Sequence, residues 1–312
     1  MKNSLNARLA GKLVTLSAVL TLAALVLPHA YAQADGQKTF SSSKEAVDVF
    51  IQAVRDGDTS ILLAILGPGS DAIISTSDAV ADKTARDRFL ANYDVKHSLT
   101  ESAPHQLSLS VGKDAWPFPI PLVHANDKWY WDGSAGKEEI LYRRIGRNEL
   151  AAIGVCKGVV AAQFDYAASG HDGLPAGIFA QGLVSEPGKK NGLYWQVGEG
   201  ESPSPAGPLL AQASAENYGT AKGSPYHGYY YRILEAQGAN ARGGAKSYIV
   251  DGKMTGGFAL IAYPADYRSS GVMTFLVNQH GTIYQKDLGE KTAELAPQMT
   301  EYNPDKSWKV VK

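Results

Sequence analysis

Aromatic and histidine side chains gather at two places in the chain where they could bind a ligand together. One place holds Tyr194 and Trp195, and the other holds His227, Tyr229 and Tyr231. Strand alternation would put His227, Tyr229 and Tyr231 on one face. Tyrosine and histidine have polar tips that need partners when buried, and ligand sites favour domain interfaces with convergent aromatic and polar groups. These five residues are the candidate ligand-binding site.

The cluster around His227 and a second aromatic cluster, Trp129–Trp131, also have a structural interpretation. The cluster around His227 starts directly after a loose stretch, so its polar tips could be satisfied where two domains meet, and the sequence favours this domain junction. Trp129 and Trp131 alternate with Tyr130 on a predicted strand, where one face could form an aromatic pocket wall. Core packing is the favoured alternative there, because aromatic residues are common in half-buried strands.

The chain contains no complete catalytic or metal-binding motif, so no catalytic residue, metal ligand or cofactor is predicted. The Gly67–Ala72 segment spells a dinucleotide-binding fingerprint but follows a predicted helix rather than a strand. The histidines stand singly, without a pair that could hold a metal from one element, although a metal site built from distant loops stays open. Cys156 is the only cysteine and lies among apolar residues, which is typical of a small buried side chain.

A pair of arginines on a predicted long helix offers a further anion-binding possibility. Arg143 lies four residues after Glu139 and four before Arg147. This spacing could present cations to an anionic ligand, but it is more typical of a solvated helical ion pair.

The balance of charge argues against a nucleic-acid partner. The 312 residues contain 30 Lys and Arg against 31 Asp and Glu, with no basic cluster beyond the Arg143–Arg147 region. The remaining partner classes are a small molecule or a component of the cell envelope.

The first 32 residues have the pattern of a signal peptide. Lys2, Arg8 and Lys12 precede the apolar run Leu13–Leu27, and Ala30–Ala32 supplies the small-x-small cleavage pattern. The apolar run is shorter than the roughly 20 residues that a membrane span needs. We therefore expect Sec-type export, cleavage after Ala32, a periplasmic or secreted protein, and no stable membrane span after removal of the peptide.

The mature chain is predicted to be an α+β protein, beginning with an N-terminal helix-plus-sheet domain over residues 33–168. Ser42 and Glu45 form a capping box for a first helix, and Asp78 caps a later helix whose Val80, Ala85, Phe89 and Leu90 share a face. Three short strands follow, with Asn126-Asp127 as a turn. Predicted elements of this domain are helices at 42–56, 60–66, 79–93 and 137–168, and strands at 105–111, 119–124 and 128–131. The apolar stripe of the last helix includes Ile140, Leu141, Ile145, Leu150, Ile153, Val160 and Phe164.

Residues 169–225 are predicted to be a linker, followed by a C-terminal antiparallel β-rich domain at 226–312. The linker contains 11 Gly and 6 Pro in 57 residues, a composition typical of loops. Asp251-Gly252 and 278–281 are hairpin signals. Continuous apolar runs at 258–263 and 272–277 predict strands covered on both faces. Further strands are expected at 229–234, 247–250 and 282–285, with a terminal helix at 291–300.

Three segments carry a resemblance to a known family. They are Trp116–Pro121, Gly136–Cys156 and above all Pro225–Tyr267. With these segments the chain resembles the bacterial exported proteins grouped as domain-of-unknown-function family 2950. The resemblance implies export and architecture, and it brings no catalytic residues with it. The first domain also resembles the cone fold of ketosteroid isomerases, and Gly271–Gly289 resembles the globular heads of pseudopilins, although no pilin-type leader precedes it.

Three classes of function are compatible with these observations. The leading hypothesis is a non-enzymatic binding or assembly module of the cell envelope, since export and aromatic clusters occur without a catalytic constellation. The second is an envelope hydrolase or isomerase with an Asp, Tyr or His site in the N-terminal pocket. The third is a pilus-like or secretion-linked structural subunit. The sequence leaves enzymatic activity open and favours its absence.

Overall fold

The computed structural model describes residues 36–198, 200–209, 213 and 224–312. The predicted signal peptide lies outside these residues. The chain from Gln33 to Lys312 forms one unit, and its buried apolar side chains fall into two cores. The first core includes Phe40, Phe50, Ile65, Leu109, Leu122 and Trp131, and the second includes Leu193, Tyr229, Tyr248, Phe258, Leu260 and Phe275.

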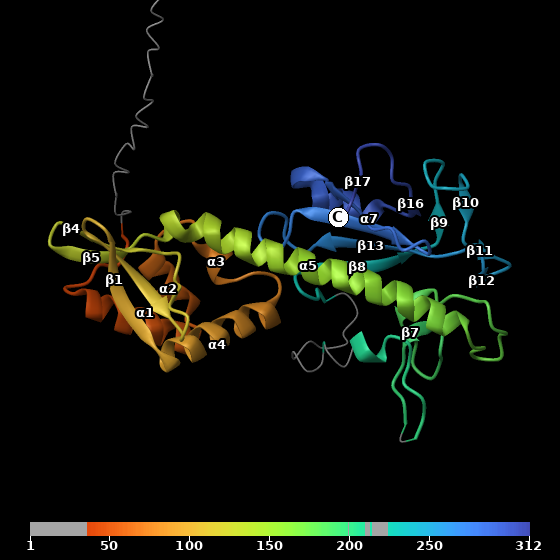
Figure 1. The fold of residues 1–312 in the computed structure, drawn as a ribbon, viewed down its shortest axis with the longest axis horizontal. Coiled ribbons are helices and arrows are strands. Elements are labelled where there is room, and N and C mark those ends of the chain that lie inside the picture. The colour runs from red at the N-terminus through yellow and green to blue at the C-terminus, as the bar shows by residue number, and fades with distance from the viewer. Residues whose placement is uncertain (1–35, 199, 210–212, 214–223) are drawn as a thin grey trace, which may run out of the picture. The chain divides into compact units, whose positions relative to one another are not determined.

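Four helices precede the first sheet (Figure 1). They are α1 (Ser43–Asp56), α2 (Thr59–Leu66), α3 (Asp71–Ile74) and α4 (Ala79–Val95). The predicted caps are present, because Ser42 Oγ accepts from the Glu45 amide at 3.1 Å and Asp78 Oδ1 accepts from the Ala81 amide at 2.9 Å. The Glu45 carboxylate accepts from the Ser41 amide at 2.9 Å, one residue before the position that the capping box predicts.

The first sheet is antiparallel, with strand order β1-β2-β4-β5 and β3 paired to β2. The strands are β1 (His97–Ala103), β2 (Gln106–Val111), β3 (Trp116–Pro117), β4 (Leu122–Ala125) and β5 (Lys128–Trp131). Asn126 and Asp127 both have positive φ angles, 51° and 57°, as the predicted turn between β4 and β5 requires. The sequence analysis missed β1, because this edge strand has no buried side chain and therefore no apolar alternation.

The long helix α5 (Gly133–Ala167) contributes to both cores. Ile140 packs on the first core, whereas Ala152, Cys156 and Val159 are buried in the second. The predicted apolar stripe is therefore wrong in part, since Leu150 is 73% exposed. Ala152, Cys156, Val159 and Ala162 are among the buried residues of α5, and such small side chains let the helix approach the second sheet closely. The helix also begins four residues earlier than predicted, because Asp132 Oδ1 accepts from the Ala135 amide at 3.1 Å.

The second sheet is antiparallel with strand order β17-β15-β14-β13-β8. Its strands are β8 (Tyr229–Leu234), β13 (Ala259–Pro264), β14 (Met273–Asn278), β15 (Tyr284–Asp287) and β17 (Lys309–Val310). Helix α5 packs on β13 and β14, and the terminal helix α7 (Thr292–Gln298) packs on β13. Nearly every residue of β13 and β14 is buried, which confirms the prediction from their continuous apolar runs.

Short strand pairs surround this sheet. The β11–β12 hairpin turns at Asp251-Gly252, as predicted. The other pairs are β6 with β7 and β9 with β10 and β16. The bounds are β6 (Gly182–Val184), β7 (Gly192–Tyr194), β9 (Ala236–Gln237), β10 (Lys246–Ser247), β11 (Ile249–Val250), β12 (Lys253–Met254), β16 (Glu301–Tyr302) and a 3-10 turn η1 (Gly289–Lys291).

The Gly/Pro-rich segment 169–225 is packed more tightly than its composition indicates. Ile178, Ala180, Leu193 and Ala206 of this segment are all buried, and the last three belong to the second core. Its described part therefore folds onto the second core. Glycine and proline shape the turns between these anchoring residues.

Candidate functional site

His227, Tyr229 and Tyr231 do not lie on one strand face. The strand β8 begins at Tyr229, and His227 lies in the turn before it. Tyr226 and Tyr229 exchange backbone hydrogen bonds of 2.8 and 3.1 Å across this turn, and His227 and Gly228 have φ angles of 50° and 72°. Positive φ at both central residues is the geometry of a two-residue hairpin turn, so strand alternation does not extend to His227.

The two tyrosines of β8 both form hydrogen bonds within the chain. Tyr229 is fully buried, and its hydroxyl donates to the Met273 carbonyl at 3.0 Å. This burial raises the pKa of Tyr229 far above its ordinary value. The Tyr231 hydroxyl donates to the Tyr226 carbonyl at 3.3 Å. These are the contacts of packed side chains.

Tyr194 and Trp195 lie at and just after the end of β7, and both pack on the second core. The centroid of the Trp195 ring lies 5.3 Å from that of the His171 ring and 5.5 Å from Lys190 Nζ. Among the described residues, the buried Nε1 of Trp195 has no hydrogen-bond partner. The binding role of the five residues stays a prediction.

The turn at His227 takes part in a polar junction. The Gly228 amide donates to Asp78 Oδ2 at 2.8 Å, and the Gly228 carbonyl accepts from Ser270 Oγ at 2.8 Å. Asn148 Nδ2 of α5 donates to the Ser270 carbonyl at 2.9 Å, and the Ser77 amide donates to Asp266 Oδ2 at 3.0 Å. The start of α4, the middle of α5 and two loops next to the second sheet are thus hydrogen-bonded together. These contacts favour the junction interpretation of the cluster.

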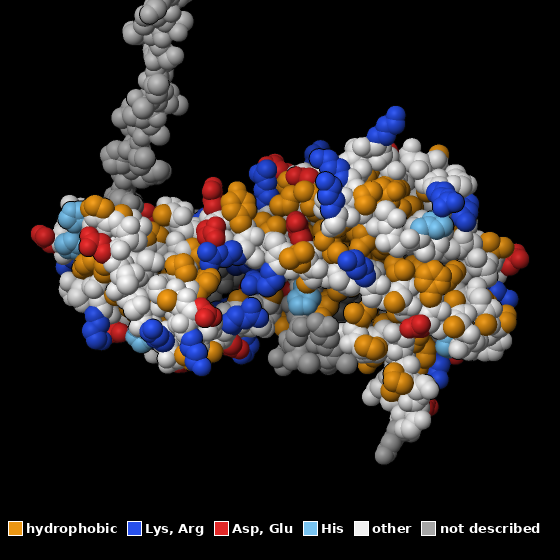
Figure 2. Space-filling model, in the orientation of Figure 1, with side chains coloured by type: hydrophobic (Ala, Val, Ile, Leu, Met, Phe, Trp, Pro, Cys, Tyr) orange, Lys and Arg blue, Asp and Glu red, His pale blue; other side chains and the backbone are white. Residues whose placement is uncertain are grey.

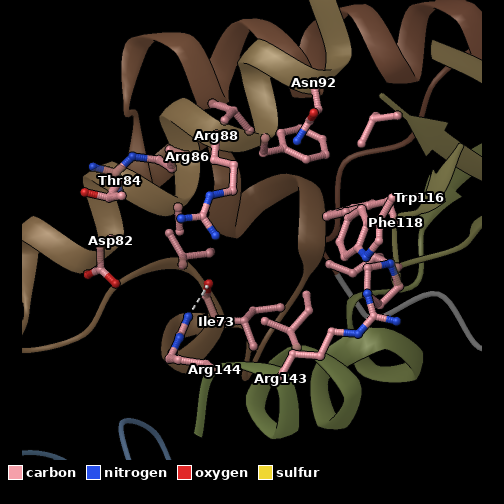
Figure 3. Close-up of a pocket in the computed structure, with 18 of the residues that line it drawn as sticks. Ile73, Asp82, Thr84, Arg86, Arg88, Asn92, Trp116, Phe118, Arg143 and Arg144 are labelled. Atoms are coloured by element: carbon pink, nitrogen blue, oxygen red, sulfur yellow. Dashed lines mark hydrogen bonds between the residues drawn. The ribbon is translucent and has the colours of Figure 1, made fainter. Parts of the chain in front are cut away.

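A cavity of about 600 Å³ lies between α4, α5 and the first sheet, and we call it the α4–α5 pocket (Figure 3). Its apolar floor consists of Phe50, Phe89 and Phe118, whose ring centroids lie 5.1 to 6.1 Å apart. Trp131 lies behind this floor, 4.9 Å from Phe50, and its Nε1 donates to the Ala46 carbonyl at 3.1 Å. Trp131 is therefore a core side chain that supports the pocket, which agrees with the favoured interpretation of its strand.

Helix α4 covers this pocket loosely. Asp82 is the only buried side chain among its 17 residues, all of which the structure describes. Phe89 and Leu90 are half-buried and pack against the first core, whereas Ala85 is exposed and lines the pocket together with Phe89. The four residues predicted to share a face of α4 are thus only partly covered by the chain, and part of that face borders a cavity.

Cationic side chains surround the apolar floor. Figure 2 shows Lys and Arg side chains around a hollow on the face that carries α4 and the start of α5. The lining includes the cations Arg86, Arg88, Lys113, Arg143, Arg144 and Arg147, against the two acids Asp82 and Asp114. The spacing of Arg143 and Arg147 indicates two of these cations in the sequence, but no sequence pattern marks the arginines of α4.

The two arginines nearest the start of α5 are held by the chain itself. Arg143 Nε donates to Glu139 at 2.5 Å, and its guanidinium lies 4.8 Å from the Trp116 ring. This is the predicted helical ion pair with an added cation–π contact. Arg144 Nη2 donates to the Ile73 carbonyl at 3.0 Å. Burial lowers the pKa of Arg144, opposed by the nearby Asp82 carboxylate.

The described residues contain no cluster of metal ligands, and the one cysteine of the chain is buried. No three His, Cys, Asp or Glu side chains gather there in a way that could hold a metal ion. Cys156 is fully buried, which raises the pKa of its thiol to about 12. The thiol is therefore protonated at neutral pH and inaccessible, so it cannot serve as a nucleophile.

The fold and the site define an α+β protein whose first core carries a pocket with an apolar floor and a cationic rim. Residues 37–311 match the family described as "Protein of unknown function (DUF2950)", so the chain belongs to that family. This confirms the resemblance seen in the sequence. No curated protein and no solved structure matches the chain.

Proposed function

We propose that the protein is an exported, non-enzymatic binding module and that the α4–α5 pocket is its ligand site. The loose packing of α4 carries this proposal: a 17-residue helix leaves its apolar face half-exposed over a cavity of about 600 Å³. Ligand pockets have volumes of roughly 300 to 1,000 Å³ and mostly apolar walls with a few polar groups. A small molecule with an apolar body would supply the packing that α4 lacks.

Export to the periplasm or beyond the cell is supported by the signal-peptide pattern that ends at Ala32. Among the described residues, one helix, α5, is long and apolar enough to cross a membrane by length and composition. Its residues Ala152, Cys156 and Val159 are buried in the second core. We therefore interpret α5 as a core helix of an envelope protein rather than as a span.

The alternative functions have less support. A hydrolase or isomerase in this pocket would need a general acid or base, but the described lining contains no Tyr or His. Of its two acids, the buried Asp82 already accepts from the Thr76 amide at 2.6 Å and from its hydroxyl at 3.0 Å, and Asp114 is exposed. The arrangement of helices over one face of a sheet around a pocket does fit the proposed cone-like first domain. Among the residues that the structure describes, no contact favours a pilus-like subunit.

Filling the pocket tests the proposal. Ala85 lines the pocket and is exposed, so Ala85→Trp places an indole in the cavity with little effect on stability. The uncharged fluorescent probe N-phenyl-1-naphthylamine should bind the mature protein, and the variant should lose roughly tenfold or more of that affinity. Fluorescence titration measures the affinity of each protein for the probe. The control is Ala91→Trp, because Ala91 is exposed on α4 but does not line the pocket.

Equal probe binding by the two tryptophan variants would contradict the proposal. So would the absence of any binding of the probe by the unaltered protein.

A further inference from the structure

The cationic rim indicates which class of molecule the α4–α5 pocket takes. Six Lys and Arg side chains line it against two acids, so the rim has an excess of positive charge. Cations gathered around a low-dielectric cavity repel one another and attract an anion. A ligand can bind only those cations that the chain does not already engage.

Two arginines of α4 are available. Arg143 is engaged by Glu139 and Trp116, and Arg144 by backbone carbonyls of the α3 region. Within the described part of the chain, Arg86 and Arg88 line the pocket without a hydrogen bond or ion pair of their own. Figure 3 shows the Arg88 side chain directed into the cavity, toward the side where Arg144 meets Ile73.

Helical spacing explains why these arginines share the pocket with apolar groups. Arg88 lies three residues after Ala85 and four before Asn92, and Arg86 lies three residues before Phe89. Residues three and four apart lie on the same helix face. Arg86 and Arg88 are only two residues apart, so they lie at opposite edges of the pocket-lining side of α4, with Ala85 and Phe89 between them.

Neither acid of the lining forms an ion pair with these arginines in the described part of the chain. The Asp82 carboxylate is buried and accepts two hydrogen bonds from Thr76, at 2.6 and 3.0 Å. An external anion is therefore the complementary group, and a guanidinium matches the two oxygens of a carboxylate or phosphate in a bidentate geometry.

We infer that the ligand is an anionic amphiphile whose carboxylate or phosphate head binds Arg88, while Arg86 adds positive charge at the edge of the pocket. Its apolar body lies on Phe50, Phe89 and Phe118 and completes the packing of α4. A free inorganic anion would leave this floor uncovered, and a cationic amphiphile would meet the positive rim. The inference rests on the proposed function, because it assigns the chemistry of the same pocket.

The inference is tested by measuring how well different amphiphiles displace bound N-phenyl-1-naphthylamine from the pocket. Every competitor is kept below its critical micelle concentration. Four competitors with the same twelve-carbon chain are compared: laurate, dodecyl phosphate, dodecanol and dodecyltrimethylammonium. Laurate, dodecyl phosphate or both should displace the probe at concentrations about tenfold lower than dodecanol, and the cation should be the weakest. The stronger of the two anions identifies the head group, and inorganic phosphate alone should not displace the probe.

Substitutions separate head-group binding from general apolar binding. Arg88→Gln should weaken the binding of the preferred anion by roughly tenfold while dodecanol binding changes far less, and Arg86→Gln should act in the same direction. Lys83→Gln is the matched control, since it removes a charge from an exposed side of α4 that does not line the pocket. It should leave the anion preference unchanged.

The experiments distinguish a wrong ligand site from a wrong head group. If the neutral probe does not bind the pocket, the proposed function is wrong. If the probe binds but all four competitors displace it equally, or if Arg88→Gln and Lys83→Gln have the same effect on the anion preference, the pocket stands and the inferred head group is wrong.

Discussion

Replacing Gly136 by alanine is expected to lower the free energy of unfolding by about 1–3 kcal/mol, the usual cost of overpacking. A Cβ atom at this position of α5 would lie 2.6 Å from Ile120 Cγ1 and 2.7 Å from the Ile120 Cα and N atoms. Ile120 is 1% exposed, so neither its side chain nor its backbone can move aside without disturbing the first core.

The same substitution ten residues further along α5, at Gly146, should have an effect of the opposite sign. A Cβ atom at Gly146 meets nothing within 4 Å. Gly146→Ala should therefore raise the free energy of unfolding by roughly 0.5–1 kcal/mol, because alanine favours a helix over glycine. Chemical denaturation of both variants checks the pair. Equal effects of the same sign would show that α5 does not approach Ile120 as closely as described.

Removal of the Asp78 side chain should be the second large effect. Asp78 is 3% exposed and accepts from two amides, that of Ala81 at 2.9 Å, which caps α4, and that of Gly228 at 2.8 Å, which belongs to the junction. Asp78→Ala removes a helix cap and leaves the buried Gly228 amide without this acceptor. Together, the lost cap and the lost acceptor are expected to lower the free energy of unfolding by about 2–4 kcal/mol.

The matched control is Asp58→Ala, because Asp58 caps α2 through the Ile61 amide at 2.9 Å and lies outside the junction. Its loss should cost about 1 kcal/mol, the typical contribution of a cap. Urea denaturation gives the loss in free energy of unfolding for each variant. The difference between the two losses measures how much the hydrogen bond from Gly228 to Asp78 stabilises the protein. If Asp78→Ala costs no more than Asp58→Ala, the contact between the start of α4 and the turn at Gly228 does not stabilise the protein.

Local signals predicted the elements of this fold well where one physical effect dominated. Ser42 and Asp78 marked helix starts through their capping hydrogen bonds, and the continuous apolar run of β14 predicted a strand covered on both faces. The signals failed where long-range packing decided the outcome. The burial of Cys156 and the exposure of Leu150 on α5 follow from how closely that helix approaches its sheet, which periodicity does not record.

The candidate site was harder to predict because its parts are far apart in the chain. The α4–α5 pocket combines Phe50, Arg88, Phe118 and Arg143 from four separate elements. Of these four residues, only Arg143 had an anion-binding interpretation from the sequence, together with Arg147, and the arginines of α4 belonged to no motif. The aromatic density around His227 pointed elsewhere, because strand alternation does not reveal a hairpin turn with two positive φ angles.

Hydrogen exchange with and without a saturating amphiphile tests the central claim most directly, namely that the ligand site is the α4–α5 pocket. The account predicts that laurate slows exchange of the α4 amides, residues 79–95, since the ligand completes the packing of that helix. Exchange in β8, residues 229–234, should not change. Unchanged exchange in α4, with protection confined to residues 194–195 and 226–231, would contradict this account and place the site at the aromatic cluster instead.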